Sequence, residues 1–277
     1  MAVQPPPQAP AAEDPPPGDE AESSRALTIL GHLQELRGRA MWSAGALVVG
    51  IAVSLWPLTG WFIDFLAEPG RNEVDNFELI FTEPLEYWTA YFRVSLLLGI
   101  TISMPVHIYQ LLAFVSPGLT WNERKWLYPI VIAATGAFLG GAAFAYYIEL
   151  PPALNFLVGQ PSSITEDLNP FIKIGSYIDF VTRLIFATAL VFELPLVVMG
   201  LAKIGIVTSK KLLGWWRYAI IGAFVGAAIV TPSIDPVTQS LVAGPIIVLY
   251  FLGIALAKLV EGSPMFARDS ANDSASD

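Results

Sequence analysis

The sequence contains no cysteine, and charged side chains make up only 14% of its 277 residues. The lack of cysteine excludes a disulfide framework, thiolate catalysis and cysteine-ligated metal sites. The two histidines, His32 and His107, lie far apart and form no ligand pair at helical spacing, so we expect no metal and no cofactor. No Gly-x-x-x-x-Gly-Lys loop is present to cradle a nucleotide. No acid–base or nucleophile constellation stands out either, so we expect neither an enzyme nor a nucleic-acid partner.

Hydrophobic residues, in contrast, make up 54% of the chain, and the mean hydropathy is +0.57. These values lie outside the range of soluble globular proteins and predict an all-α, polytopic membrane protein in a lipid bilayer. Six apolar stretches are candidate transmembrane helices: Ala40–Leu66, Glu86–Val115, Tyr128–Leu150, Thr182–Leu201, Tyr218–Val230 and Val237–Ala257.

The two ends of the chain are polar. Residues 1–24 are rich in proline and acid, and we expect them to be disordered because they have few apolar side chains to bury. Residues 25–39 place leucines at helical spacing beside charges, which predicts an amphipathic helix that lies at the membrane surface and runs into the first span. We therefore expect a six-helix membrane domain over residues 25–257 and a polar tail over residues 258–277.

The fifth apolar stretch, Tyr218–Val230, has 13 residues, or about 20 Å of helix against a hydrocarbon core of about 30 Å. The sixth follows after the turn Thr231-Pro232-Ser233-Ile234-Asp235-Pro236 and carries Gln239 and Pro245. We expect both helices to be short and the bilayer beside them to be thinned.

The basic residues predict the orientation in the membrane. Six spans put both termini on one side, and Lys and Arg gather there: Arg25, Arg37, Arg39, Arg124, Lys125, Lys203, Lys210, Lys211, Arg217, Lys258 and Arg268. The opposite side has Arg71 and Lys173. The positive-inside rule then places both termini in the cytoplasm of a multi-pass protein of the cell membrane.

A single carboxylate, Glu193, lies in the middle of the fourth stretch, two residues before Pro195. A charge at mid-membrane costs at least roughly 2.5–3.5 kcal/mol, so intramembrane acids are candidates for function. The alternative is a hydrogen-bonded glutamate that only joins helices. Pro195 removes a backbone hydrogen bond and predicts a kink beside the acid.

Two further acids, Glu35 and Glu123, lie among the bases of the side predicted to be cytoplasmic. They could simply balance charge, since surface ion pairs contribute little. They could also each hold a guanidinium in a bidentate fork, a geometry that lysine cannot match. The second reading predicts a ligand with arginine side chains.

Several short motifs occur in a telling order along the chain: His32-Leu33-x-Glu35-Leu36-Arg37-x-Arg39, Ala113-Phe114-x-Ser116-Pro117-Gly118-Leu119 with Glu123-Arg124, Phe144-Ala145-Tyr146, Phe192-Glu193-x-Pro195, and Thr231-Pro232 with Asp235 and Gln239. Together they resemble TatC, the multispanning receptor of the twin-arginine protein translocase. The resemblance covers about residues 30–257. The turn before the sixth span departs from the Thr-Pro-Pro-Asp of many relatives.

The resemblance implies a cup-shaped bundle that binds the twin-arginine signal peptides of folded cargo proteins. It implies that Glu35 and Glu123 face the two arginines, with Phe114 and Arg37 beside them. Glu193 would be the buried acid of the concave face. Gln239, Thr231 and Asp235 would contact single-span subunits of the TatA and TatB type, with export driven by the proton motive force.

Two other classes remain open from the residues alone. A proton-coupled secondary transporter would also use a mid-membrane acid such as Glu193 beside broken helices. An intramembrane enzyme would need a second catalytic group at the same depth. A mid-membrane Ser–His pair or a second carboxylate would favour that reading.

Overall fold

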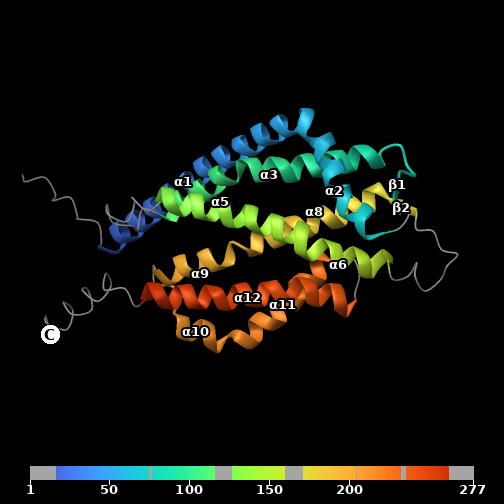
Figure 1. Cartoon of the computed structure of the whole chain (residues 1–277). Coiled ribbons are helices and arrows are strands. Elements are labelled where there is room, and N and C mark those ends of the chain that lie inside the picture. The colour runs from blue at the N-terminus through green and yellow to red at the C-terminus, as the bar shows by residue number, and fades with distance from the viewer. Residues whose placement is uncertain are drawn as a thin grey trace, which may run out of the picture.

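The structure is a computed structural model that describes residues 17–74, 77–115, 127–159, 171–203, 205–231 and 235–261. Long helices lie side by side. The first described helix starts, and the last described helix finishes, at the same end of the bundle (Figure 1). The helices are α1 (Pro17–Val53), α2 (Thr59–Glu73), α3 (Glu86–Val115), α5 (Leu127–Phe144), α6 (Leu150–Leu154), α8 (Ile174–Val191), α9 (Leu194–Lys203), α10 (Ser209–Gly214), α11 (Trp216–Val230) and α12 (Pro236–Glu261).

Within the described residues, five helical segments are long and apolar enough to cross a membrane: Leu33–Trp56, Glu86–Phe114, Tyr128–Gly159, Ile174–Lys203 and Pro236–Glu261. Helix α11 is a shorter apolar helix of 15 residues. The predicted all-α architecture of six apolar helices is therefore confirmed. So is the short fifth helix, since 15 residues extend about 22 Å.

The sequence predicted a short sixth helix, but this helix has 26 residues. It begins at Pro236 and continues past Ala257 to Glu261, whose carboxylate Oε1 and Oε2 accept hydrogen bonds from the Ser209 N–H and Oγ at 2.6 Å each. This contact joins the last turn of α12 to the first turn of α10. Ser209 and Glu261 are 52 residues apart, so their contact leaves no local pattern in the sequence. The predicted helix therefore ended too early, at Ala257.

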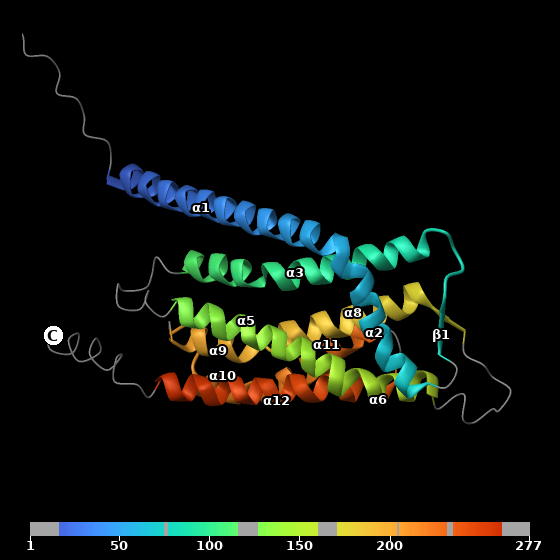
Figure 2. The same ribbon diagram turned by 45° about the horizontal axis from the view of Figure 1, so that its top comes forward.

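The first helix also differs from the prediction. Helix α1 begins at Pro17, inside the segment expected to be disordered, because proline suits a first helical position and helix-forming residues follow it. It then runs without a break through residues 25–39 to Val53 (Figure 2). The predicted amphipathic segment thus runs directly into the first span, as the sequence predicted, and forms one helix with it.

Helix α1 ends where Trp56 adopts an extended conformation with φ −146° and ψ 118°. Trp56 precedes Pro57, and a residue before proline is pushed out of the helical region. The freed polar groups find partners on α3 and α2: the Ser54 Oγ donates to the Ser95 carbonyl at 2.9 Å, and the Thr59 Oγ1 donates to the Ser54 carbonyl at 2.8 Å. The Tyr91 hydroxyl donates to the Leu55 carbonyl. Neighbouring side chains thereby satisfy the broken backbone, as a membrane interior requires.

Helices α1 and α3 cross at two glycines. A Cβ atom on Gly50 would lie 2.5 Å from the Gly99 carbonyl oxygen, and one on Gly99 would lie 2.9 Å from the Ile51 backbone nitrogen. Small residues at a crossing allow this close backbone approach, which is a common way for helices to associate in membranes.

Helix α8 forms the centre of the bundle. Its residues Ile178, Val181, Leu184 and Ala189 are fully buried, and it packs against both α3 and α5. Helix α9 continues from α8 after a break and packs against α12.

A small parallel sheet of β1 (Glu78–Ile80) and β2 (Phe171–Lys173) lies at the end of the bundle opposite the start of α1 (Figure 2). Its register pairs Leu79 with Ile172. Strands of three residues are too short to show a period of two, so the sequence did not indicate them. Beside the sheet, the carboxylate of Glu86 accepts the Gly175 N–H at 3.0 Å and ties the first turns of α3 and α8 together.

Candidate functional site

Helix α1 begins, and α3 and α12 end, at the same end of the bundle, here called the basic end (Figure 1), and the described signal-binding candidates lie on α1 and in the last turn of α3. Glu35 lies on α1, half-buried, and Phe114 lies partly buried in the last turn of α3. Arg37 is exposed on α1. Glu123 lies outside the described residues.

Glu35 already holds a guanidinium. The Arg39 Nη2 and Nε atoms both donate to the Glu35 Oε1, at 2.6 and 3.0 Å, one helical turn apart on α1. The spacing of four residues brings such side chains onto one face of a helix. The pair shows that a guanidinium fits beside this carboxylate, although both donors go to the same oxygen, and binding of a ligand arginine here stays a prediction.

Glu193 lies in the break between α8 and α9, as the Pro195 kink predicted. Its side chain is only 9% exposed, and its Oε1 atom has no hydrogen-bond partner among the described residues. Glycines hold the break closely: a Cβ atom on Gly141 of α5 would lie 2.8 Å from the Cβ of Phe192, and one on Gly253 of α12 would lie 3.3 Å from the Cα of Pro195. The acid is thus held in the interior at a joint between two helical segments.

A second buried carboxylate, Glu149, was not singled out from the sequence. It is 1% exposed and belongs to a π-helical turn, Ala145–Glu149, within the third span. Its Oε2 atom accepts a hydrogen bond from the Thr188 Oγ1 of α8 at 2.6 Å, whereas its Oε1 has no partner among the described residues. The sequence signal was present in an acid between Ile148 and Leu150, but the predicted span ended at Leu150 and so placed this acid at the interface.

Glu149 lines a small apolar cavity of about 90 Å³ where α8, α11 and α12 meet. Thr188 and Val191 of α8, Gly226 of α11, and Pro245 of α12 also line it. The interior of the bundle therefore contains two acids, Glu149 and Glu193, each with one unpartnered oxygen.

The predicted partner-binding residues make contacts inside the chain. Asp235 caps α12, since its Oδ1 accepts the Thr238 N–H at 2.7 Å. The Gln239 Nε2 donates to the Phe224 carbonyl of α11 at 2.9 Å. The Thr231 Oγ1 donates to the Ala227 carbonyl at 2.9 Å and is buried. Of these three contacts, that of Gln239 joins α12 to α11, whereas Asp235 and Thr231 cap the start of α12 and the end of α11.

Comparison with known proteins relates this arrangement to one family. The family model described as "Sec-independent protein translocase protein (TatC)" matches residues 31–245. A protein of the same name from Synechocystis is 37% identical over 87% of this chain and 92% of its own length. The chloroplastic TATC protein of Arabidopsis thaliana is 38% identical over 87% of this chain and 69% of its own.

A solved structure shares the fold. The crystal structure described as "Twin Arginine Translocase Receptor- TatC" superposes with a TM-score of 0.75 at 34% identity, covering 83% of this chain and 99% of that one. The family-model match over residues 31–245 includes Glu35, Glu149 and Glu193. The chain is a multi-pass membrane protein and belongs to the TatC family of Sec-independent protein translocase components.

Proposed function

We propose that this chain binds the twin-arginine signal peptides of folded cargo at its basic end, through Glu35 and Glu123. The observation that supports the proposal is the hydrogen-bonded pair of Glu35 and Arg39, because a guanidinium already lies beside this carboxylate. A signal arginine exchanges with Arg39 or shares the carboxylate with it. Phe114, at the neighbouring end of α3, adds an apolar surface, and Arg37 adds a further donor.

The proposal includes an orientation. The basic end carries Lys203 in the last turn of α9, Lys211 in the last turn of α10 and Lys258 in the last turn of α12. By the positive-inside rule this end faces the cytoplasm of a cell membrane, where folded cargo waits for export. The apolar part of the signal then enters the bundle towards Glu193.

Single-span subunits of the TatA and TatB type dock beside α11 and α12 in this proposal. Gln239 and Thr231 occupy the level at which these two helices join, and Asp235 fixes the start of α12. The short α11 favours a thinned bilayer there, and the proton motive force drives transport. The family assignment favours this function over the alternative of a proton-coupled secondary transporter that uses Glu193.

The test is the binding of a labelled signal peptide to the purified chain in detergent, comparing an Arg-Arg peptide with its Lys-Lys twin. We expect the wild type to prefer the Arg-Arg peptide and expect Glu35→Gln and Glu123→Gln each to weaken it by about tenfold or more, since a charged hydrogen bond contributes about 1.5–3 kcal/mol. Asp64→Asn is the matched control, because Asp64 pairs with Arg71 at 3.5 Å on α2, away from the basic end.

Equal binding of the two peptides, or an equal loss in the Asp64→Asn variant, would contradict recognition by these carboxylates.

A further inference from the structure

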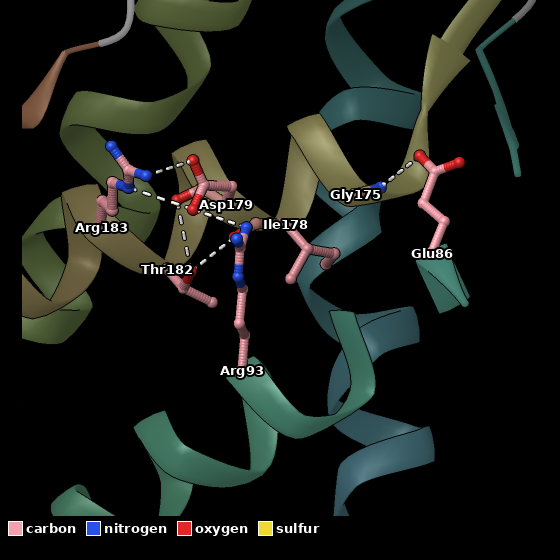
Figure 3. Close-up of polar contacts among 7 residues, drawn as sticks. All are labelled: Glu86, Arg93, Gly175, Ile178, Asp179, Thr182 and Arg183. Atoms are coloured by element: carbon pink, nitrogen blue, oxygen red, sulfur yellow. Dashed lines mark hydrogen bonds and ion pairs between the residues drawn. The ribbon is translucent and has the colours of Figure 1, made fainter. Parts of the chain in front are cut away.

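A charged cluster lies at the opposite end of the bundle, where α3 and α8 begin, and plays no part in the proposed function. Figure 3 shows Arg93 of α3 and Arg183 of α8 converging on Asp179 of α8. The Arg93 Nη1 lies 2.6 Å from the Asp179 Oδ1. The Arg183 Nε and Nη2 lie 3.0 and 2.9 Å from the Oδ1 and Oδ2.

The cluster has one more positive charge than negative charge. Among the described residues, Arg93 and Arg183 form ion pairs with Asp179 alone, so two guanidinium groups share one carboxylate. The nearest other acid on these first turns, Glu86, is occupied by the N–H groups of Thr82 and Gly175. Each guanidinium has five N–H donors. The Arg183 Nε donates to the Asp179 Oδ1, and the Arg93 Nη1 and Arg183 Nη2 form ion pairs with the same carboxylate, which leaves most of the ten donors without a contact to it.

Both guanidinium groups remain accessible. The side chain of Arg93 is 42% exposed and that of Arg183 is 56% exposed, against 27% for Asp179 between them. The acid is therefore the inner member of the cluster, and the unused donors of the two arginines face outwards.

The exposed surface around the cluster is apolar. On α8, the exposed side chains one and two turns beyond Arg183 are Phe186 and Leu190. On α3, the exposed side chains flanking Arg93 are Phe92 and Leu96 on the apolar side. Trp88, also exposed, lies five residues before Arg93, about 7.5 Å along the helix towards the outside. Tryptophan marks the headgroup region, so the arginines lie at or just below it, within reach of it by their long side chains.

We propose that Arg93 and Arg183 bind the phosphate of an anionic phospholipid in the leaflet at this end of the bundle. The planar guanidinium fork matches phosphate oxygens in a bidentate geometry, and the net charge of +1 matches a headgroup of charge −1. Asp179 positions the two arginines, one from each helix, so that both point towards the same headgroup. The bound lipid bridges α3 and α8 on their lipid-facing side.

This site explains an anomaly of the charge distribution. Basic residues are concentrated at the basic end, where the positive-inside rule accounts for them, and that rule gives no reason for two arginines at the opposite rim. The second arginine has a role when an anion binds.

The experiment measures lipid selectivity directly. The full chain is reconstituted in phosphatidylcholine nanodiscs with a trace of nitroxide-labelled phosphatidylglycerol or labelled phosphatidylcholine, and electron paramagnetic resonance gives the immobilised fraction of each. We expect the wild type to prefer phosphatidylglycerol and expect Arg93→Gln and Arg183→Gln each to lower that preference about fivefold, the value for one basic residue near an anionic headgroup.

Arg71→Gln is the matched control, because Arg71 lies in the last turn of α2, is exposed, and is paired with Asp64 outside the cluster. Arg93→Lys combined with Arg183→Lys preserves charge and helps to preserve folding, and we expect it to retain only part of the preference because lysine lacks the fork. Circular dichroism and size-exclusion profiles confirm that each variant is folded.

Soluble glycerol phosphate provides a second arm. If the site takes a lipid, millimolar glycerol phosphate leaves the immobilised lipid fraction unchanged, whereas displacement of the lipid would show a site for free phosphate and overturn the proposal. An equal loss in Arg71→Gln, or no lipid preference in the wild type, would overturn it too. If the wild type shows no lipid preference, the arginine pair would instead be available to bind an acidic side chain of a protein partner.

Discussion

Helix α8 carries one acid, Asp179, and contacts another, Glu149 of the third span, in very different surroundings, and the contrast shows how a membrane protein can accommodate a carboxylate. At its first turns, Asp179 lies half-buried and is held by the guanidinium groups of Arg93 and Arg183. Nine residues further, about 13.5 Å along the helix, Thr188 donates its hydroxyl to Glu149 of the third span. Asp179, at the rim, is held by two charged guanidinium groups, whereas Glu149, in the interior, accepts one hydrogen bond from a neutral hydroxyl.

The energetics of the two places differ in kind. An exposed ion pair at the rim is screened by water and salt and contributes about 0–1 kcal/mol. In the interior, a polar group without its hydrogen bond has no water to replace the partner, so the same loss costs more. Removing a contact is therefore expected to lower the free energy of unfolding most at Glu149, which has few contacts, and least at Asp179, which has several.

The sharpest test of this contrast is removal of the hydroxyl that Glu149 accepts from. We expect Thr188→Val to lower the free energy of unfolding by about 1.5–3 kcal/mol, because the buried carboxylate loses its donor. Thr182→Val on the same helix is the control, since the Thr182 Oγ1 donates to backbone carbonyls of its own helix, those of Ile178 and Asp179, and not to a carboxylate. Both are measured by chemical unfolding in detergent micelles. Equal losses in the two variants would show that Glu149 does not depend on Thr188.

A double variant sharpens the same comparison with a smaller expected effect. Glu149→Met combined with Thr188→Val removes both polar partners and keeps a similar volume beside the cavity of about 90 Å³. Replacing both partners of a buried polar pair by apolar groups can be nearly neutral. We expect the double variant to unfold within about 1 kcal/mol of the wild type, clearly above Thr188→Val alone. A double variant as unstable as Thr188→Val, or less stable, would show that the pair holds the helices together.

The same pair shows how far sequence reasoning could go. The bounds of α3, Glu86–Val115, and the break at Glu193 were predicted correctly, because an uninterrupted apolar run and a proline beside a charge are local signals. Glu149 was missed because Pro151 and Pro152 were taken as the end of the third span. The helix continues to Gly159 through π-helical turns on either side of those prolines, and the Asn155 N–H donates to both of their carbonyls.

The candidate sites divide in the same way. The Glu35–Arg39 contact follows from a spacing of four residues and could be predicted from the sequence. The contact of Arg93 with Asp179 joins positions on two different helices, as does that of Glu149 with Thr188, and nothing local encodes either pairing. Glu123 lies outside the described residues, so its place beside Glu35 stays a prediction.

The smallest effect is expected at the rim. We expect Asp179→Asn to lower the free energy of unfolding by less than about 1 kcal/mol, because both guanidinium groups are exposed enough for water to replace the carboxylate. Salt separates the two regions further: screening at 1 M ionic strength acts over about 3 Å and weakens exposed pairs far more than buried contacts. The loss in Asp179→Asn should therefore shrink when unfolding is repeated at high salt, whereas the loss in Thr188→Val should stay constant. A rim effect that is large and insensitive to salt would mean that Asp179 is enclosed in the membrane-embedded protein, most simply by the ligand that its two arginines hold.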